Sequence, residues 1–142
     1  VWLTGEIPIT NDVEKIPASF LAGVNDFFVP DDFADDNSLL LDTDKGIVVV
    51  FGCAHRGIVN ILTYVKKMFE KNIRAIIGGT HLHDTSQEQL DYVKSYLREL
   101  IQEDRVELFA PAHCTGIQTI MELSAEFKDV TKPAFCGSVF EF

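Results

Sequence analysis

The four histidines are the residues whose positions most clearly suggest chemistry. Three of them, His55, His81 and His113, each follow a short apolar segment and lie in a turn rich in small residues. An imidazole nitrogen is a good ligand for zinc and for non-haem iron. Three imidazoles at equivalent positions therefore predict a divalent-metal site that keeps open positions for water or substrate.

The elements that must position these histidines alternate along the chain. From residue 47 onward we predict strands at 47–51, 74–77, 106–109 and 138–142, and helices at 57–71, 86–102 and 116–127. This order predicts an α/β sheet with helical crossovers. Parallel strands bring their carboxyl ends to one edge, where such folds bind ligands, so the three histidines are expected to meet there.

Two of the predicted helices have further local signals. Ser86, followed by Gln89, fits the capping-box pattern that begins a helix. The third helix is expected to bury a stripe of four apolar residues: Ile117, Ile120, Met121 and Leu123.

The region before residue 47 is predicted to be a loop-rich entry followed by a strand. Residues 1–37 are punctuated by glycine and proline, which favours irregular structure with a short strand near Trp2. Leu39–Leu41 and the run 47–51 predict a hairpin. The acidic stretch 31–36 is interpreted as a solvated loop or as a loop near a metal or substrate. We expect residues 1–142 to form a single domain, with 38–142 as its βαβαβα core.

Other residues beside the histidines leave alternatives open. Cys53 and Cys114 each lie close to a histidine, and a thiolate is a good zinc ligand. Neighbouring residues usually point in different directions, so the simpler interpretation is a buried thiol. The side chain of His83 could lie on the same face of an extended segment as that of His81. It could equally lie in solvent where the next helix begins, and we leave His83 unassigned.

Two further interpretations concern the turn after the third predicted strand. Thr115–Gly116 at a helix start could present N–H groups to an anion such as phosphate, although a simple helix cap is the favoured interpretation. Cys114 with His113 could act as a nucleophile and its base, but no spacing favours that pair.

Composition restricts the class of protein. A net charge of −10 argues against a surface that neutralises phosphates, so nucleic acid is an unlikely partner on charge grounds. Three cysteines without a cysteine-rich framework predict a cytoplasmic protein with reduced thiols. The chain has no apolar run long enough to span a membrane. It begins with Val1 rather than Met, which suggests a processed or truncated piece.

Four segments together carry a family resemblance. They are Thr4–Pro8 (TGEIP), Gly52–Ile61 (GCAHRGIVNI), Ile77–Leu82 (IGGTHL) and Pro111–Gly116 (PAHCTG). The chain resembles metallo-β-lactamase-fold metallohydrolases, in the subfamily related to dihydropterin ribofuranosyl-aminobenzene phosphate synthase. The resemblance implies half of an αββα sandwich with a mixed β-sheet, and a one- or two-metal site between the halves.

The resemblance also implies which residues bind the metal, and it shows where this chain departs from the family's pattern. His55 and His113 fall on the later two histidine ligand positions of the family. Where the wider superfamily commonly has a metal-bridging aspartate, this chain has His81 in a Gly-Gly-Thr-His turn. The principal His-x-His-x-Asp-His cluster is absent, so the chain resembles only the C-terminal half of the fold.

These patterns lead to one leading function and one alternative. The leading function is a metal-dependent hydrolase or hydrolase-like transferase that uses a metal-activated water, with His55, His81 and His113 as ligands. Zinc is the expected metal, with iron or manganese as alternatives. The expected substrate is a small molecule, and phosphorylated compounds are included in this class. The expected protein partner is the missing N-terminal half or a second copy of the chain. Alone, the chain is expected to be weak or inactive. The alternative is a non-catalytic ligand-binding or assembly module.

Overall fold

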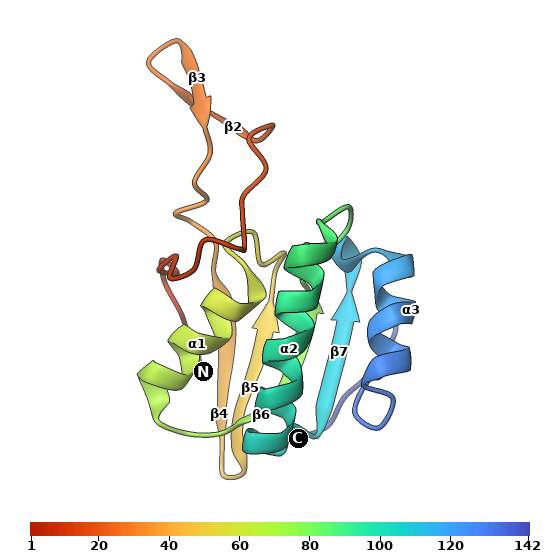
Figure 1. The fold of residues 1–142 in the computed structure, drawn as a ribbon. Helices are drawn as coiled ribbons and strands as arrows, with labels where there is room; N and C mark the ends of the chain where they lie inside the picture. The colour runs from red at the N-terminus through yellow and green to blue at the C-terminus, as the bar shows by residue number, and fades with distance from the viewer.

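The centre of the fold is a five-stranded mixed sheet with the strand order β1-β4-β5-β6-β7. The computed structural model describes residues 1–142. In chain order, the elements are β1 (Trp2–Leu3), β2 (Leu21–Val24), β3 (Phe27–Pro30), β4 (Ser38–Thr43), β5 (Gly46–Phe51), α1 (Ile58–Phe69), β6 (Ile73–Gly79), α2 (Gln87–Asp104), β7 (Leu108–Ala112), the 3₁₀ turn η1 (His113–Thr115) and α3 (Ile117–Glu126). Figure 1 shows helices α1 and α2 in front of this sheet.

The pairing of the strands confirms the predicted mixed α/β sheet. Strands β4 and β5 form the expected antiparallel hairpin, with Leu40 opposite Val49. Strands β5, β6 and β7 are parallel neighbours, linked by α1 and α2. Because these parallel strands run the same way, the turns that leave β5, β6 and β7 lie at the same edge of the sheet.

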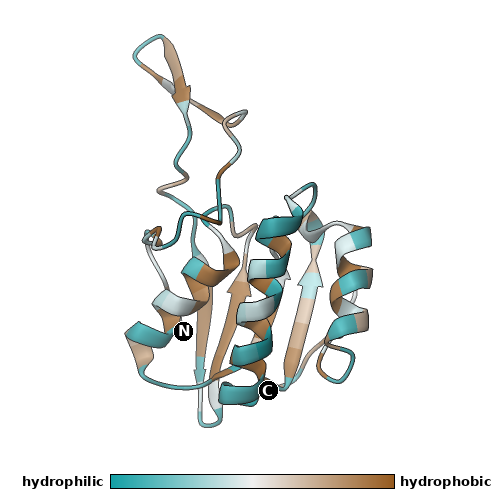
Figure 2. Cartoon of the chain, viewed as in Figure 1, coloured by the Kyte–Doolittle hydropathy of each residue, from teal (hydrophilic) through white to brown (hydrophobic).

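The main core lies between the sheet and the helices. A cluster of 22 buried residues joins alternate side chains of β5 and β6 to the inner faces of α1 and α2. Phe109, Ile61 and Leu97 are fully buried in it. In Figure 2 the strands are brown, while much of the outward face of α2 is teal. Burial of one helical stripe is what holds these amphipathic helices on the sheet.

The other face of the sheet has a much smaller cover. Val48, Ala75, Leu108 and Ala110 form a separate cluster there, against which Phe140 from the C-terminal segment packs. Leu39 points to the same side and remains 38% exposed. This face is therefore only partly covered by the chain itself.

The ends of the helices follow the predicted local chemistry. Ser86 is the N-cap of α2, and its Oγ accepts a hydrogen bond from the Gln89 N–H at 3.2 Å. Asp104, the last residue of α2, is buried and accepts hydrogen bonds from the Ile73 N–H at 2.8 Å and from Lys66 at 2.7 Å. One carboxylate thus joins the end of α2 to α1 and to the start of β6.

The predicted strand at 138–142 is wrong. The chain runs beside β7 earlier, where Thr131 makes one parallel bridge with Phe109. Pro133 follows and has no N–H to continue a ladder. The final residues pack on the sheet through Phe140 without pairing as a strand.

The predicted stripe of α3 is half wrong. Ile120 and Leu123 are buried as expected, but Ile117 and Met121 are 62% and 67% exposed. The helix is short and contacts the sheet along a narrower face than the sequence pattern suggested. Its outer surface is consequently apolar at two positions.

A hairpin that we did not predict lies within residues 1–37. Strands β2 and β3 pair across a tight turn in which Asn25 and Asp26 both have positive φ, 46° and 67°. Two consecutive positive φ values, with asparagine and aspartate, are typical of a type I′ hairpin turn. Figure 1 shows the hairpin projecting away from the sheet, and Phe27 and Phe28 in it are largely exposed.

None of the helices combines the length and apolar character that crossing a membrane would require.

Candidate metal centre

Three turns at one edge of the sheet carry the predicted histidines. His55 follows β5, His81 follows β6 and His113 follows β7, as the sequence predicted. Each turn contains a non-glycine residue with left-handed backbone: Ala54 (φ 55°), His81 (φ 50°) and His113 (φ 47°). Such conformations cost about 1–3 kcal/mol each and are concentrated at functional sites. The strain is shared by all three turns that would form the site.

His55 and His81 lie close together. Their ring centroids are 4.3 Å apart and the rings are tilted by 44°. Phe33 stacks on the other face of His55 at 3.9 Å with an interplanar angle of 5°. Phe20 meets both imidazoles edge-on, at 5.4 Å from His55 and 5.6 Å from His81. Two phenylalanines that flank the β2–β3 hairpin therefore fix the orientation of the histidine pair.

The two imidazoles differ in their surroundings. The Nδ1 atom of His55 is buried and has no hydrogen-bond partner in the protein. Burial lowers the pKa of His81 below its usual value, and the nearby His55 lowers it further. A neutral imidazole is the form that binds a metal. The lowered pKa of His81 therefore favours its metal-binding form, and the Nδ1 atom of His55 is left without a partner within the protein.

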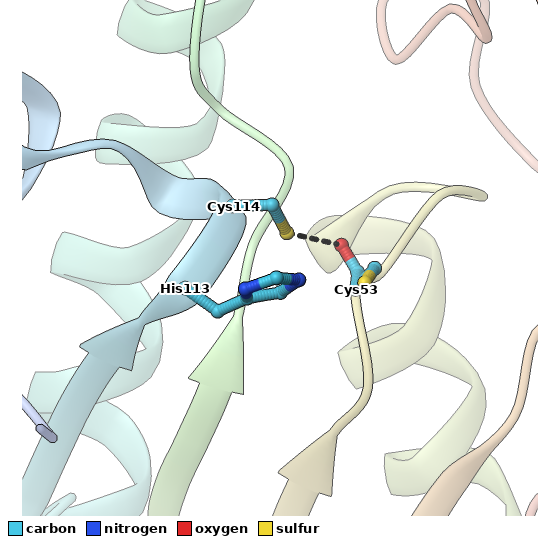
Figure 3. Close-up of side chains that lie close together, drawn as sticks. All are labelled: Cys53, His113 and Cys114. Atoms are coloured by element: carbon cyan, nitrogen blue, oxygen red, sulfur yellow. Dashed lines mark hydrogen bonds between the residues drawn. The ribbon is translucent and has the colours of Figure 1, made fainter. Parts of the chain in front are cut away.

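His113 lies with two cysteines instead. One donor atom each from Cys53, His113 and Cys114 lie within 4.8 Å of one another. Figure 3 shows the His113 ring extending from the end of β7 toward Cys53, with the Cys114 side chain directed to the same place. The Cys114 thiol donates to the Cys53 carbonyl oxygen, with Sγ and O 3.4 Å apart. No group of three such donor atoms this close includes His55 or His81.

The thiol of Cys114 is poorly suited to nucleophilic chemistry in this state. Burial raises its pKa to about 11, and the neighbouring Cys53 contributes to the rise. Reactive cysteines have lowered pKa values and partial exposure near positive charge. The structure therefore gives the cysteine–histidine nucleophile no support.

Hydrogen bonds between backbone and side chains hold the three turns against one another. The Gly79 N–H donates to the Gly52 carbonyl oxygen at 3.2 Å, which joins the turns after β5 and β6. The Thr80 hydroxyl and N–H both approach the buried Thr115 hydroxyl, at 3.0 and 3.2 Å, which joins the turns after β6 and β7. Thr115 is thus a buried tie between turns, which explains this residue without an anion site.

Arg56 and Asn60 fasten the N-terminal loops to the site. Arg56 is 5% exposed, and its guanidinium contacts the carboxylate of Glu6, the carbonyl of Ile7 and Asp32. Asn60 is fully buried, donates to the Arg56 carbonyl oxygen and accepts from the N–H and the hydroxyl of Thr10. These contacts place the entry loops over the turn that carries His55.

Comparisons with known proteins agree with this architecture over the whole chain. The crystal structure of a metal-dependent hydrolase of the β-lactamase superfamily superposes with a TM-score of 0.85 and 30% identity, covering 99% of this chain and 52% of that chain. A 7,8-dihydropterin-6-methyl-4-(β-D-ribofuranosyl)-aminobenzene-5′-phosphate synthase of Methanocaldococcus jannaschii is 31% identical over 146 residues, 100% of this chain and 48% of that protein.

The chain belongs to the metallo-β-lactamase superfamily. An uncharacterized protein of the same archaeon is 35% identical over 96 residues, 68% of this chain and 33% of that protein. No protein-family model matches the chain. This metallo-β-lactamase-fold chain spans about half the length of the synthase and of the hydrolase that it matches.

The residues of this metallo-β-lactamase-fold chain fit a divalent metal. The likeness to a metal-dependent hydrolase and the Cys/His cluster both support one. The unpartnered, buried Nδ1 of His55 is a further observation, because an unsatisfied buried polar atom usually costs about 1–3 kcal/mol. Nitrogen and sulfur donors are those that a borderline metal prefers.

A cleft of about 310 Å³ adjoins the histidine pair. His55 and His81 line it together with polar residues from the start of α2, such as Ser86 and Gln89. Glu14 lies on its other side and caps α1, accepting from the Val59 N–H at 2.9 Å and the Asn60 N–H at 3.0 Å. Burial raises the pKa of Glu14, although these hydrogen bonds act in the opposite direction.

Sequence reasoning left some of these residues unassigned or missed them. His83 is 67% exposed at its side chain and pairs with Asp84 at 3.1 Å, so it does not join either group. Asp36, in the acidic stretch, is buried and accepts from the Arg56 N–H at 2.9 Å. Phe20 and Phe33 were missed because only the tertiary fold brings them onto the imidazoles.

Proposed function

We propose that this chain supplies metal ligands to a metal-dependent hydrolase, or to a hydrolase-like transferase. The observation that carries the proposal is the pair of imidazoles of His55 and His81 at the carboxyl edge of a parallel sheet. The likeness of this whole chain to about half of a metal-dependent hydrolase supports the same role. His113, on the neighbouring turn, is the third proposed ligand. Residues 1–142 are proposed to act as one folded unit.

Zinc is the proposed metal, because its usual protein ligands are imidazole nitrogen and thiolate sulfur, with iron and manganese as alternatives. When bound, a divalent metal supplies a Lewis acid and lowers the pKa of water to about 7. The chain's own contribution is to hold the imidazoles in fixed orientations. Phe33 and Phe20 do this by packing on the rings of His55 and His81.

The remaining ligands are proposed to come from outside these 142 residues. The whole of this chain aligns with about half of the synthase and about half of the hydrolase. Each of these two relatives therefore contains a comparable length of additional protein. We propose that this other half, or a second copy of the chain, completes the centre. The chain alone is accordingly proposed to be weak or inactive as a catalyst.

The proposed substrate is a small molecule, and phosphorylated compounds are included in this class. The name of the archaeal relative describes the synthesis of a phosphate compound, and its likeness to this chain supports such a substrate class. The cleft beside His55 is lined mostly by polar residues, which suits a polar ligand. The absence of disulfides among the three cysteines accords with the proposed cytoplasmic location.

A second candidate is a non-catalytic module for binding or assembly. It is favoured by apolar side chains that the chain leaves exposed, such as Phe27 and Phe28 on the hairpin and Leu39 on the partly covered sheet face. Light scattering addresses this candidate directly. A stable monomer that binds no hydrophobic dye would rule out the assembly role.

The leading proposal is tested by hydrolysis of bis(p-nitrophenyl) phosphate by the whole protein that carries this chain. Activity should disappear with a chelator and return with zinc, and His55→Ala should lower kcat by about 100-fold or more. The matched control is Met121→Ala, on the exposed face of α3, which should leave turnover unchanged. Turnover that survives complete metal removal would contradict the proposal.

A further inference from the structure

Cys53, His113 and Cys114 bring three metal-binding atoms together from two separate turns. Cys53 belongs to the turn after β5, and His113 and Cys114 form the 3₁₀ turn that follows β7. Their donor atoms lie within 4.8 Å of one another. Sulfur and nitrogen ligands bind zinc at about 2.3 and 2.0–2.1 Å, so donors on one zinc ion are separated by somewhat less than 4.8 Å.

We propose that Cys53, His113 and Cys114 form a binding site for a thiophilic metal ion, of which Zn²⁺ is the probe ion of choice. Two thiolates and one imidazole leave a fourth position open in tetrahedral geometry. This donor set selects for zinc or other thiophilic ions over magnesium and calcium, which prefer oxygen. The site is thus chemically different from the pair formed by His55 and His81.

The backbone around the cluster keeps room for the sulfur atoms. A Cβ on Gly79 would lie 2.7 Å from Cys114 Sγ and 2.7 Å from the Gly52 carbonyl oxygen. Gly79 does not have a positive φ, so the close approach rather than backbone conformation requires glycine there. The absence of a side chain at Gly79, at the end of the middle strand β6, therefore lets Cys114 reach across to the turn of Cys53.

Ties between the turns fix the two cysteines relative to each other. The Gly79–Gly52 hydrogen bond holds β6 to the turn of Cys53, and the Thr80–Thr115 contacts hold β6 to the turn of Cys114. The left-handed backbone of His113 lets consecutive residues, His113 and Cys114, both turn toward Cys53. This answers the objection that neighbouring residues point apart.

The proposal is independent of the hydrolase proposal, although His113 is common to both. If the chain had no catalytic role, these three residues would still bind a thiophilic ion. His55→Ala should weaken metal binding by the His55–His81 pair and leave metal binding by Cys53, His113 and Cys114 intact. His113→Ala should weaken metal binding at both sites. The two proposals can therefore fail separately.

The first test is a titration of the 142-residue chain with Co²⁺ as a spectroscopic substitute for Zn²⁺. The wild type should develop sulfur-to-cobalt charge-transfer absorption in the near ultraviolet, and excess Zn²⁺ should abolish it. Cys53→Ser and Cys114→Ser should each lose at least half of the band. His55→Ala and the matched control Cys136→Ser, at an exposed cysteine, should retain it. Absence of the band in the wild type, or its loss in Cys136→Ser, would overturn the site.

The second test needs no variant and covers the case in which a serine substitution unfolds the chain. Alkylation of the wild type with iodoacetamide is followed by mass spectrometry with and without Zn²⁺. Zn²⁺ should slow the modification of Cys53 and Cys114 by about tenfold or more and leave Cys136 unaffected. Equal labelling of Cys53 and Cys114 in both conditions would overturn the proposal.

Discussion

The imidazole rings of His55 and His81 lie with their centroids 4.3 Å apart, although the residues belong to turns that follow different strands. Parallel pairing of β5 and β6 brings those turns to one edge, and the Gly79–Gly52 hydrogen bond holds them there. The rings are held from outside by Phe33 and Phe20. The geometry of the histidine pair therefore depends on both the sheet and the N-terminal loops.

Loss of the Phe33 ring should loosen His55. Phe33→Ala removes the stacked partner at 3.9 Å, so the imidazole gains freedom that metal binding must then restrict. We expect zinc affinity to fall by roughly tenfold, as for other residues that orient a metal ligand. Competition with a chromophoric chelator measures this. Phe28→Ala, at an exposed phenylalanine of the hairpin, is the control, and equal affinities for the two variants would argue against a positioning role.

Arg56 should be sensitive to even a conservative change. Arg56→Lys keeps the charge but cannot reproduce the contacts to Glu6, Ile7 and Asp32 with one ammonium group. We expect the free energy of unfolding to fall by about 1–3 kcal/mol, because the buried carbonyl oxygen of Ile7 loses its donor. Urea denaturation provides the measurement. Arg105→Lys, at an exposed arginine, should change stability by less than about 0.5 kcal/mol, and a similar loss in both variants would refute the argument.

A methyl group at Gly79 should be costly for reasons of space. Gly79→Ala places a Cβ 2.7 Å from both Cys114 Sγ and the Gly52 carbonyl oxygen, so the turns must separate. We expect a destabilisation of about 1–3 kcal/mol. The control is Gly23→Ala in the β2–β3 hairpin, where a Cβ meets nothing within 4 Å. If thermal denaturation found Gly79→Ala as stable as Gly23→Ala, the close approach of the turns would be wrong.

The contact between α2 and α3 should become less stable in acid, because protonation of Glu126 weakens its ion pairs with Lys94 and Arg98. Burial by itself raises the pKa of Glu126, but hydrogen bonds from Lys94 and Arg98 outweigh it and hold the pKa below the usual 4.5. A lowered folded-state pKa means that the stabilisation is fully present above about pH 4.5 and disappears as the pH falls through the folded-state value.

Glu126→Gln should therefore lower the free energy of unfolding at pH 7 by about 0.5–1 kcal/mol, and the difference from the wild type should shrink below pH 4.5. Urea denaturation at several pH values gives the comparison. Glu103→Gln, at a carboxylate 71% exposed and 3.8 Å from Lys66, should have little effect at any pH. A wild-type advantage that grows in acid would contradict the assignment.

Periodicity in the sequence was sufficient for the elements that bury one face. The three helices and the β4–β5 hairpin were predicted because their apolar residues recur at helical or strand spacing. The strand at 138–142 was wrong because apolar residues such as Phe140 can pack on a sheet face without pairing. The β2–β3 hairpin had a signal that we did not use, the Asn25–Asp26 pair between apolar residues.

The candidate site was only partly accessible from sequence. The positions of His55, His81 and His113 after parallel strands follow from the order of the elements. Their division into a histidine pair and a Cys53–His113–Cys114 cluster does not, because it depends on ring orientations and on left-handed backbone at non-glycine residues. Only the folded chain determines these features.

The central claim is that the sheet edge binds metal through His55, His81 and His113. Elemental analysis of the chain, dialysed against Zn²⁺ and then against metal-free buffer, tests it most directly. We expect near-stoichiometric zinc in the wild type, a lower content in His55→Ala, a still lower content in His113→Ala, and no change in the control His83→Ala. A wild-type chain without zinc, or a His55→Ala chain with the full wild-type content, would contradict the account.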